Sequence, residues 1–183
     1  MAVALTVLSI LVLSYTALLI LVNVGMFRRT PVQRRQGPLP AVSVILPAHN
    51  EQERLPDTLR SLAAQEYAGP LEFVIVDDRS SDLTPVIIDS WAERDSRFRR
   101  HTVTADSRRF SPKVNAVNSG ILVSAGEVII TTDADCSYPK GWVAGMVSHF
   151  SGDTVMVVGY VETTRAWQSR SPVQLFEATD WLS

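Results

Sequence analysis

The chain begins with 27 residues that carry no charged side chain, and the rest of it alternates short apolar runs with amphipathic stretches. As a helix, residues 1–27 would be about 40 Å long, which exceeds the roughly 30 Å hydrocarbon core of a bilayer. A cleaved signal peptide would need a basic start, a shorter apolar stretch and a small-residue cleavage site, and none of these precedes Arg28. We therefore predict an uncleaved transmembrane helix over residues 1–27.

Four arginines follow this apolar segment within eight residues: Arg28, Arg29, Arg34 and Arg35. Positive charge next to a membrane span favours the cytoplasmic side. We therefore expect a single-pass membrane protein whose folded domain is cytoplasmic. Residues 28–40 also contain three prolines, which predicts a basic, proline-rich and extended linker between the membrane and that domain.

Short runs of apolar and β-branched residues predict strands at 42–46, 71–76, 128–132 and 155–158. A weaker candidate at 98–103 is interrupted by arginines. Helical patterns lie between these runs, and in the first of them Leu55, Leu59 and Leu62 share one face. Prolines predict the starts of further helices at Pro85, Pro112, Pro139 and Pro172. This alternation predicts an α/β domain over residues 41–183, built on a doubly wound, mostly parallel sheet.

The charge of this domain argues against a nucleic-acid partner. The four arginines are the only basic residues before position 36 and no acidic residue precedes them, so residues 36–183 hold 13 basic and 19 acidic side chains. Contacts to phosphate backbones need clustered positive charge. A hydrophobic content of 46% is enough for one packed core.

Polar clusters follow three of the predicted strands, and ligands of such sheets bind beyond the carboxyl ends of the strands. The first strand runs into the loop 47–51, the second into 77–82 and the fourth into Asp133-Ala134-Asp135, while Lys113 lies in the helix before the fourth strand. Aspartates gathered at one edge need a compensating cation, and a divalent metal supplies it. The spacing of Asp133 and Asp135 directs both carboxylates to the same side of an extended chain.

Four segments in this order resemble the successive motifs of the family 2 glycosyltransferases, which bind nucleotide-sugars through the GT-A fold: VSVILPAHNEQERL, FVIVDDRSSDLT, SPKVNAVNSG and VIITTDADCSYPKGW. The likeness covers about residues 41–160. It implies that one loop and one aspartate hold the nucleotide base, usually uracil: Pro47, Ala48, His49, Asn50, Glu51 and Asp78. It also implies that Lys113 lies near the diphosphate, that Asp133 contacts ribose or metal, and that Asp135 ligates Mg²⁺ or Mn²⁺.

Several of these residues also have purely structural interpretations. Asp77 and Asp82 precede the helix at Pro85, and aspartate is a residue type that commonly occupies turns and helix caps. His49 is either a turn residue or a ring that stacks on the base, and Glu51 favours the start of the following helix. Lys113 in a first helical turn opposes the helix dipole, so a structural role is less expected for it.

The general base of the reaction is unassigned. Inverting members of this family use an acidic residue well downstream of the Asp-x-Asp motif to take the proton of the acceptor hydroxyl. Glu177 and Asp180 are the last two carboxylates of the sequence, and we interpret both as surface or interface residues of a helix. We therefore expect the chain to be a fragment or a truncated form of a longer enzyme.

The resemblance implies a metal-dependent, inverting transfer of a sugar from a UDP-type donor. The expected acceptor is a lipid, a polysaccharide or another acceptor at the cytoplasmic membrane face. Two other classes stay open. A nucleotidyltransferase would need a glycine-rich basic loop after the first strand, which residues 47–51 do not supply. A non-catalytic, membrane-tethered nucleotide-sugar-binding protein is favoured only by the missing base.

Overall fold

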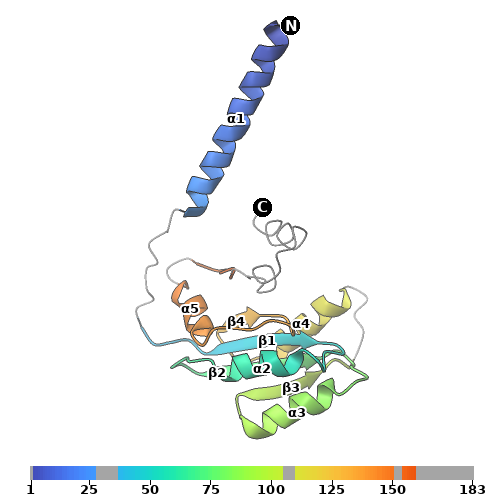
Figure 1. Cartoon of the computed structure of the whole chain (residues 1–183). Helices are drawn as coiled ribbons and strands as arrows, with labels where there is room; N and C mark the ends of the chain where they lie inside the picture. The colour runs from blue at the N-terminus through green and yellow to red at the C-terminus, as the bar shows by residue number, and fades with distance from the viewer. Residues whose placement is uncertain (1, 28–36, 105–109, 151–153, 160–183) are drawn as a thin grey trace. The chain divides into compact units, whose positions relative to one another are not determined.

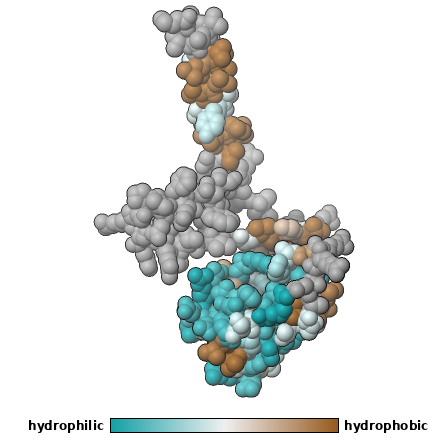
Figure 2. Space-filling model, turned by 90° about the vertical axis from the view of Figure 1, so that its right-hand side faces the viewer, coloured by the Kyte–Doolittle hydropathy of each residue, from teal (hydrophilic) through white to brown (hydrophobic). Residues whose placement is uncertain are grey.

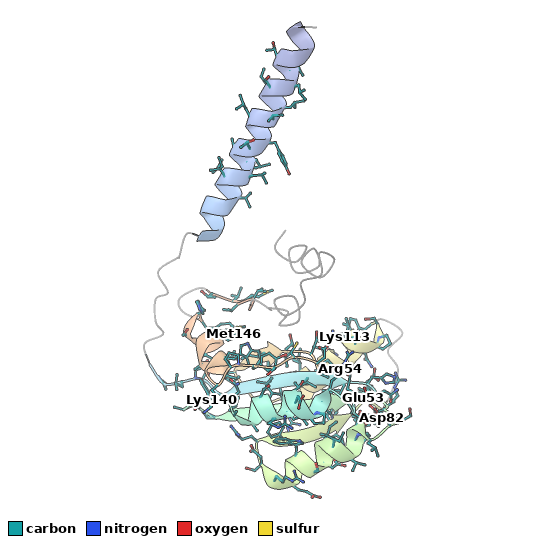
Figure 3. All side chains as sticks on the ribbon, in the orientation of Figure 1. Glu53, Arg54, Asp82, Lys113, Lys140 and Met146 are labelled. Atoms are coloured by element: carbon teal, nitrogen blue, oxygen red, sulfur yellow. The ribbon has the colours of Figure 1, made fainter. Side chains whose placement is uncertain are left out.

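The computed structural model describes residues 2–27, 37–104, 110–150 and 154–159, and the chain divides into two compact units, Met1–Gln33 and Arg34–Ser183. The first unit contains helix α1 (Ala2–Phe27). Its described side chains, at positions 6–22, are exposed and mostly apolar (Figures 2 and 3). Within the described part of the chain, no helix combines the length and the apolarity that a membrane span requires, so the predicted transmembrane helix is not confirmed.

The second unit is built on a parallel sheet of four strands in the order β3-β2-β1-β4 (Figure 1). The strands are β1 (Val42–Ala48), β2 (Leu71–Asp77), β3 (Phe98–Thr102) and β4 (Val128–Thr131). The expected α/β parallel sheet is therefore confirmed. The weak candidate is an edge strand in which Arg99 pairs with Glu72 and Arg100 pairs with Asp89, so its arginines keep partners.

Helices cover both faces of this sheet (Figure 1). Helix α4 (Pro112–Val123) packs on one face against Ile45, Val74 and Val76. Helices α2 (Leu55–Ala63), α3 (Thr84–Arg94) and α5 (Trp142–Ser148) contribute to the larger core on the other face. The doubly wound arrangement is the one that the sequence predicts, because strands buried on both faces read as continuous apolar runs.

The close approach of α4 to the sheet depends on Gly120, which lies on the side of the helix that faces the sheet. A Cβ atom at this position would lie 2.6 Å from Ile45 Cγ2 and 2.7 Å from Val76 Cγ2, closer than side chains pack. Both partners are completely buried branched residues with little room to move. Glycine is therefore required where the helix contacts β1 and β2.

Two predictions on regular structure differ from the model. Residues 154–159 have no regular structure, and Val155 and Val158 are 92% and 78% exposed, so the predicted strand at 155–158 is wrong for this chain. A strand needs a hydrogen-bonded neighbour, and no described strand pairs with this segment. The helix expected at Pro139 begins instead at Trp142, after a turn in which Trp142 donates its backbone N–H to the Pro139 carbonyl. Pro172 lies outside the described residues.

Candidate functional site

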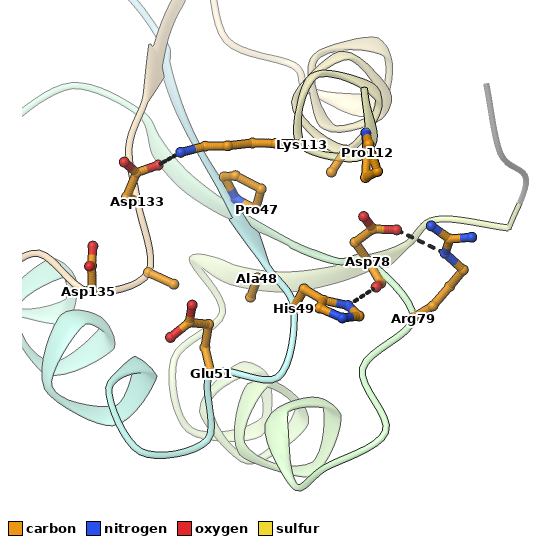
Figure 4. A pocket seen from close by; sticks show the side chains of 12 residues that line it. Pro47, Ala48, His49, Glu51, Asp78, Arg79, Pro112, Lys113, Asp133 and Asp135 are labelled. Atoms are coloured by element: carbon orange, nitrogen blue, oxygen red, sulfur yellow. Dashed lines mark hydrogen bonds and ion pairs between the residues drawn. The ribbon is translucent and has the colours of Figure 1, made fainter. Parts of the chain in front are cut away.

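The polar clusters meet in a pocket of about 510 Å³ at the carboxyl edge of the sheet (Figure 4). Its walls come from the ends of β1, β2 and β4 and from the first turn of α4. The lining residues are Pro47, Ala48, His49, Glu51, Asp78, Arg79, Pro112, Lys113, Ala116, Asp133, Ala134 and Asp135. The structure thus brings together every site residue that the sequence singled out except Asn50, whereas their roles toward a ligand stay predictions.

Strand register places the first two loops side by side. Ala48 at the end of β1 pairs with Asp77 at the end of β2, and Asp78 continues this pairing by donating its N–H to the Ala48 carbonyl at 2.9 Å. His49 and Asp78 therefore leave the sheet next to each other. We call the part of the pocket formed by these two loops the loop end.

The His49 ring is oriented by Asp78. Its Nδ1 lies 2.6 Å from the Asp78 backbone carbonyl, and a carbonyl only accepts hydrogen bonds, so Nδ1 carries the proton. Nε2 is then the acceptor in the neutral ring, and the Asn50 side-chain amide donates to it at 3.3 Å. The ring lines the pocket in this fixed orientation, which is compatible with stacking on a base.

Asn50 joins the two loops instead of lining the pocket. It has a left-handed backbone, with φ of 54°, a conformation that asparagine tolerates better than most residues. Its N–H donates to Ser80 Oγ at 3.0 Å, and its Oδ1 accepts the Ser81 N–H at 2.8 Å. Its amide oxygen is therefore occupied by the second loop and its amide nitrogen by His49, and Asn50 is not among the residues that line the cavity.

Asp82 also connects the loops, although its position suggested only a cap. Its carboxylate accepts N–H bonds from Gln52 at 3.1 Å and from Thr84 at 2.9 Å. The cap position of α3 itself is Leu83, which makes no side-chain capping bond. Desolvation raises the pKa of Asp82, but hydrogen bonds from Thr84 and Gln52 outweigh it and hold the pKa below its ordinary value. The turn interpretation fits Asp77, whose Oδ1 accepts the Ser80 N–H at 3.0 Å.

The opposite part of the pocket carries ion pairs, and we call it the charged end. Lys113 Nζ lies 2.8 Å from Asp133 Oδ1, and Arg54 Nη1 lies 3.6 Å from Asp135 Oδ2. All four side chains are at least half exposed. The hydrogen bond to Asp133 raises the pKa of Lys113 against a smaller opposing effect of burial, so the ammonium stays charged at neutral pH. Figure 3 labels both cations, Lys113 on α4 and Arg54 just before α2.

The donor set of the charged end fits a divalent ion that shares its ligands with a substrate. Asp133 and Asp135 supply hard carboxylate oxygens, and Mg²⁺ or Mn²⁺ is commonly held by one or two carboxylates together with substrate phosphates. In the described part of the chain, no group of three or more His, Cys, Asp or Glu residues could hold a metal by itself. The two carboxylates therefore fit a site that a diphosphate would complete.

Sequence reasoning missed two arginines. Arg79 lines the pocket and donates through Nε to Asp78 Oδ1 at 3.0 Å, and Arg54 contacts Asp135. Both lie within segments that resemble family motifs, but the resemblance assigns roles there to the asparagine, glutamate and aspartate residues and not to the arginines. Trp142, which follows the Asp133-Ala134-Asp135 cluster in the chain, stacks on Tyr138 with ring centroids 4.0 Å apart and packs against the larger core. Glu177 and Asp180 lie outside the described residues.

Curated proteins with similar sequences are glycosyltransferases. A probable glycosyltransferase, YdaM, of Bacillus subtilis is 38% identical over 98 residues, which cover 53% of this chain and 23% of that protein. The undecaprenyl-phosphate 4-deoxy-4-formamido-L-arabinose transferase of Pectobacterium carotovorum is 33% identical over 126 residues, covering 68% of this chain and 37% of that protein. The chain thus spans well under half the length of these relatives.

A solved structure and a family model agree with these relatives. The mannosyltransferase of Pyrobaculum calidifontis, in complex with GDP-Man and Mn²⁺, superimposes with a TM-score of 0.63 at 30% identity, covering 76% of this chain and 41% of that one. The model of the family described as Glycosyl transferase family 2 matches residues 43–177, which include all four pocket-forming segments. The α/β sheet is therefore that of the GT-A fold, and the chain belongs to glycosyl transferase family 2.

Proposed function

We propose that this chain is the donor-binding part of a glycosyltransferase that moves a sugar from a nucleotide-diphosphate donor to an acceptor. One observation carries the proposal: a single pocket joins a hydrogen-bonded loop end to a charged end. A nucleotide-sugar has the same division, with a flat polar base at one side and a diphosphate at the other. The mannosyltransferase relative, solved with GDP-Man, supports a donor of this class.

At the loop end, the proposal assigns the base to His49 and Asp78. The carboxylate of Asp78 can accept from a base N–H, and a site built to bond a polar group rejects analogues that lack it. The His49 ring, held by the Asp78 carbonyl, offers a flat surface on which the base can stack. We propose a UDP-type donor, since Asp78 complements the N3–H of uracil.

At the charged end, the proposal assigns the diphosphate to Lys113 and the carboxylates to a divalent ion. Bound Mg²⁺ or Mn²⁺ would neutralise the charge that develops on the departing diphosphate. Asp135 would hold the ion, with Asp133 as second ligand or ribose contact. Lys113 would supply a further positive charge that the Asp133 pair keeps protonated. The mannosyltransferase solved with Mn²⁺ supports this assignment.

The proposal extends to the acceptor and to the membrane. Helix α1 has 26 residues without a charged side chain and precedes the arginine cluster, which supports a membrane anchor with the pocket on the cytoplasmic side. One relative is named for a transfer that involves undecaprenyl phosphate. We propose a lipid or another membrane-proximal acceptor and an inverting transfer, whose general base is not assigned to any described residue.

Calorimetry of the full chain with UDP and with UDP-sugars tests the proposal. Binding is expected in the low-micromolar to millimolar range with Mn²⁺ or Mg²⁺, and it should be lost with a chelator. Asp57→Asn is a matched control for substitutions of Asp133 and Asp135. Asp57 also pairs with an arginine on an exposed surface, but it lies outside the pocket lining. Equal binding with and without the metal would remove the role given to Asp133 and Asp135, and no nucleotide binding would contradict the proposed function.

A further inference from the structure

We propose that Thr58 is a positioning residue for the proposed metal ligands Asp133 and Asp135, because its buried hydroxyl fixes the backbone between their side chains. The inference rests on the proposed function, since it assumes that these two carboxylates share a divalent ion. It adds a residue of helix α2 that does not line the pocket and that would act through the backbone of Ala134.

The backbone of Ala134 is anchored, although the side chains on either side of it are exposed. Thr58 Oγ1 donates to the Ala134 carbonyl at 2.7 Å, and these two residues are only 1% and 5% exposed. The side chains of Asp133 and Asp135 are about half exposed and lie at the edge of the cavity (Figure 4). The two carboxylates therefore reach the pocket from a stretch of backbone that is fixed in the interior.

The bond from Thr58 fixes the orientation of one peptide group. The Ala134 carbonyl belongs to the peptide that joins Ala134 to Asp135, and a peptide group is planar. Its orientation therefore sets the direction in which the Asp135 side chain leaves the backbone. Before Asp133, Thr132 donates its N–H to the Ile45 carbonyl at 3.0 Å, which ties the chain to β1. The segment that carries both aspartates is thus held on each side of Asp133.

A second side chain next to α2 supports the segment that follows the aspartates. Gln65 comes seven residues after Thr58, about two helical turns, and it is also buried. Its Nε2 donates to the Pro139 carbonyl at 2.8 Å, and its Oε1 accepts the Val143 N–H at 3.1 Å. Thr58 differs from Gln65 because its bond lies between the two aspartates, where a change in the backbone would move a proposed metal ligand directly.

Loss of the Thr58 hydroxyl would leave a buried carbonyl without this partner. Buried backbone groups are nearly always paired, and leaving one unpaired is costly. We therefore expect the Ala134 peptide to turn toward another partner, and Asp135 would change direction with it. Replacing a residue that orients metal ligands commonly costs tenfold to 100-fold in metal affinity. Thr58 should therefore affect the metal-dependent part of nucleotide binding.

Thr58→Val tests this role on the full chain, because valine has nearly the shape of threonine but lacks the hydroxyl. The Mn²⁺ concentration that gives half-maximal UDP binding should rise by about tenfold or more. At saturating Mn²⁺, the affinity for UDP should return close to that of the parent chain, because the contacts proposed for the base are unchanged. Thr58→Ser keeps the hydroxyl and should keep the Mn²⁺ requirement of the parent chain. Calorimetry over a series of Mn²⁺ concentrations measures the requirement, and the electron paramagnetic resonance signal of free Mn²⁺ measures the bound metal directly.

Ser43→Ala is the matched control for the loss of a buried hydroxyl. Ser43 is completely buried near the start of β1, at the opposite end of this strand from the pocket. Its Oγ donates to Glu72 and accepts the Gly126 N–H at 2.7 Å. Ser43→Ala should lower the melting temperature and leave the Mn²⁺ requirement unchanged. If Ser43→Ala and Thr58→Val raised this requirement equally, at an equal loss of melting temperature, Thr58 would act through stability alone and the positioning role would be wrong.

The outcomes distinguish this inference from the proposed function. If UDP binding depends on Mn²⁺ and Thr58→Val leaves that dependence unchanged, the role of Thr58 is overturned and the proposed function stands. UDP binding that is independent of Mn²⁺ in the parent chain would overturn the metal site and the role of Thr58 together, and no nucleotide binding would overturn the proposed function as well. If Thr58→Val did not fold, Thr58→Ala would remove the same hydroxyl with a smaller side chain and give the same comparison with Thr58→Ser.

Discussion

The two ends of the pocket are built in different ways. At the loop end, the Asn50 amide oxygen accepts from the Ser81 N–H and the Asp82 carboxylate accepts from the Gln52 N–H, and these bonds tie the loops after β1 and β2 together. At the charged end, the contacts that the described residues make with the carboxylates of Asp133 and Asp135 are exposed ion pairs with Lys113 and Arg54 and a long contact of 3.7 Å from the Cys136 thiol to Asp135. Exposed ion pairs contribute at most about 1 kcal/mol each and exchange partners readily. The difference indicates that the loop end is formed before the ligand arrives and that the charged end is completed by it.

The largest effect is expected when the charged end loses its metal ligand. Asp135→Asn should weaken the Mn²⁺-dependent part of UDP binding by roughly 100-fold, because one of two carboxylates assigned to the ion is lost. The preference among bases should persist. Titration of UDP with and without Mn²⁺ measures this effect, with Asp57→Asn as control for the loss of an exposed Asp–Arg pair.

The corresponding change at the loop end is Asp78→Asn. It should weaken UDP binding by roughly tenfold to 100-fold, the effect of losing a hydrogen bond to a charged group, and the response to Mn²⁺ should remain. Binding of UDP and ADP across a range of Mn²⁺ concentrations measures both properties. If this variant and Asp135→Asn lost base preference and metal response together, in proportion to their loss of stability, the two ends would not be separate.

The hydrogen bonds between the two loops should contribute measurably to the free energy of unfolding. Asn50→Ala should lower the free energy of unfolding by about 1–2 kcal/mol, because it removes the bond to Ser81 and puts alanine into a left-handed backbone. Asn50→Gly loses the same bond but accepts the backbone conformation, so it should cost less. Urea unfolding of the three proteins separates the two contributions, and an equal loss in both variants would contradict the role of the backbone.

The ion pairs of the charged end should contribute much less to stability. Lys113→Gln is expected to change the free energy of unfolding by less than about 0.5 kcal/mol, since Lys113 and Asp133 are both mostly exposed. The same change should weaken nucleotide binding several-fold through loss of a charge near the diphosphate. Melting curves and titrations on one preparation measure both, and a large loss of stability would show that this end is also built in advance.

The smallest effect concerns acid pH. The pKa of Asp82 in the folded chain lies below its ordinary value of 3.8, so the carboxylate stabilises the fold above that pH. This contribution is lost as the pH falls through the lowered pKa. Asp82→Asn removes it, so the melting temperature of the variant should fall less than that of the parent chain between about pH 5 and pH 3. Parallel slopes would indicate that the bonds to Gln52 and Thr84 do not depend on the charge.

Much of the fold could be predicted from local patterns. The runs at β1, β2 and β4 are continuous because both faces of these strands are buried, and the proline positions predict the starts of α3 and α4 closely. The run 155–158 has the same composition but no neighbouring strand in the described part of the chain. Composition shows that a segment could be a strand, whereas pairing depends on residues elsewhere.

The candidate site could be located from the sequence, but its internal contacts could not. Parallel strands bring their carboxyl ends to one edge, so the motifs had to meet there. Arg79 lines the pocket whereas Asn50 does not, and both residues have positive φ angles. Neither is glycine, so the sequence gave no sign of these backbone conformations. The bonds of Asp82 depend on the distance between two loops, which only the assembled sheet defines.

The glycine on the sheet-facing side of α4 has a consequence for the pocket. Gly120 lies seven residues after Lys113 on the same helix, about 10 Å along its axis. Because both residues lie on one helix, the depth at which Gly120 rests on Ile45 and Val76 also limits how closely the first turn of α4, which carries Lys113, approaches the sheet. A residue with no side chain thus helps to position the helix turn whose lysine lines the cavity.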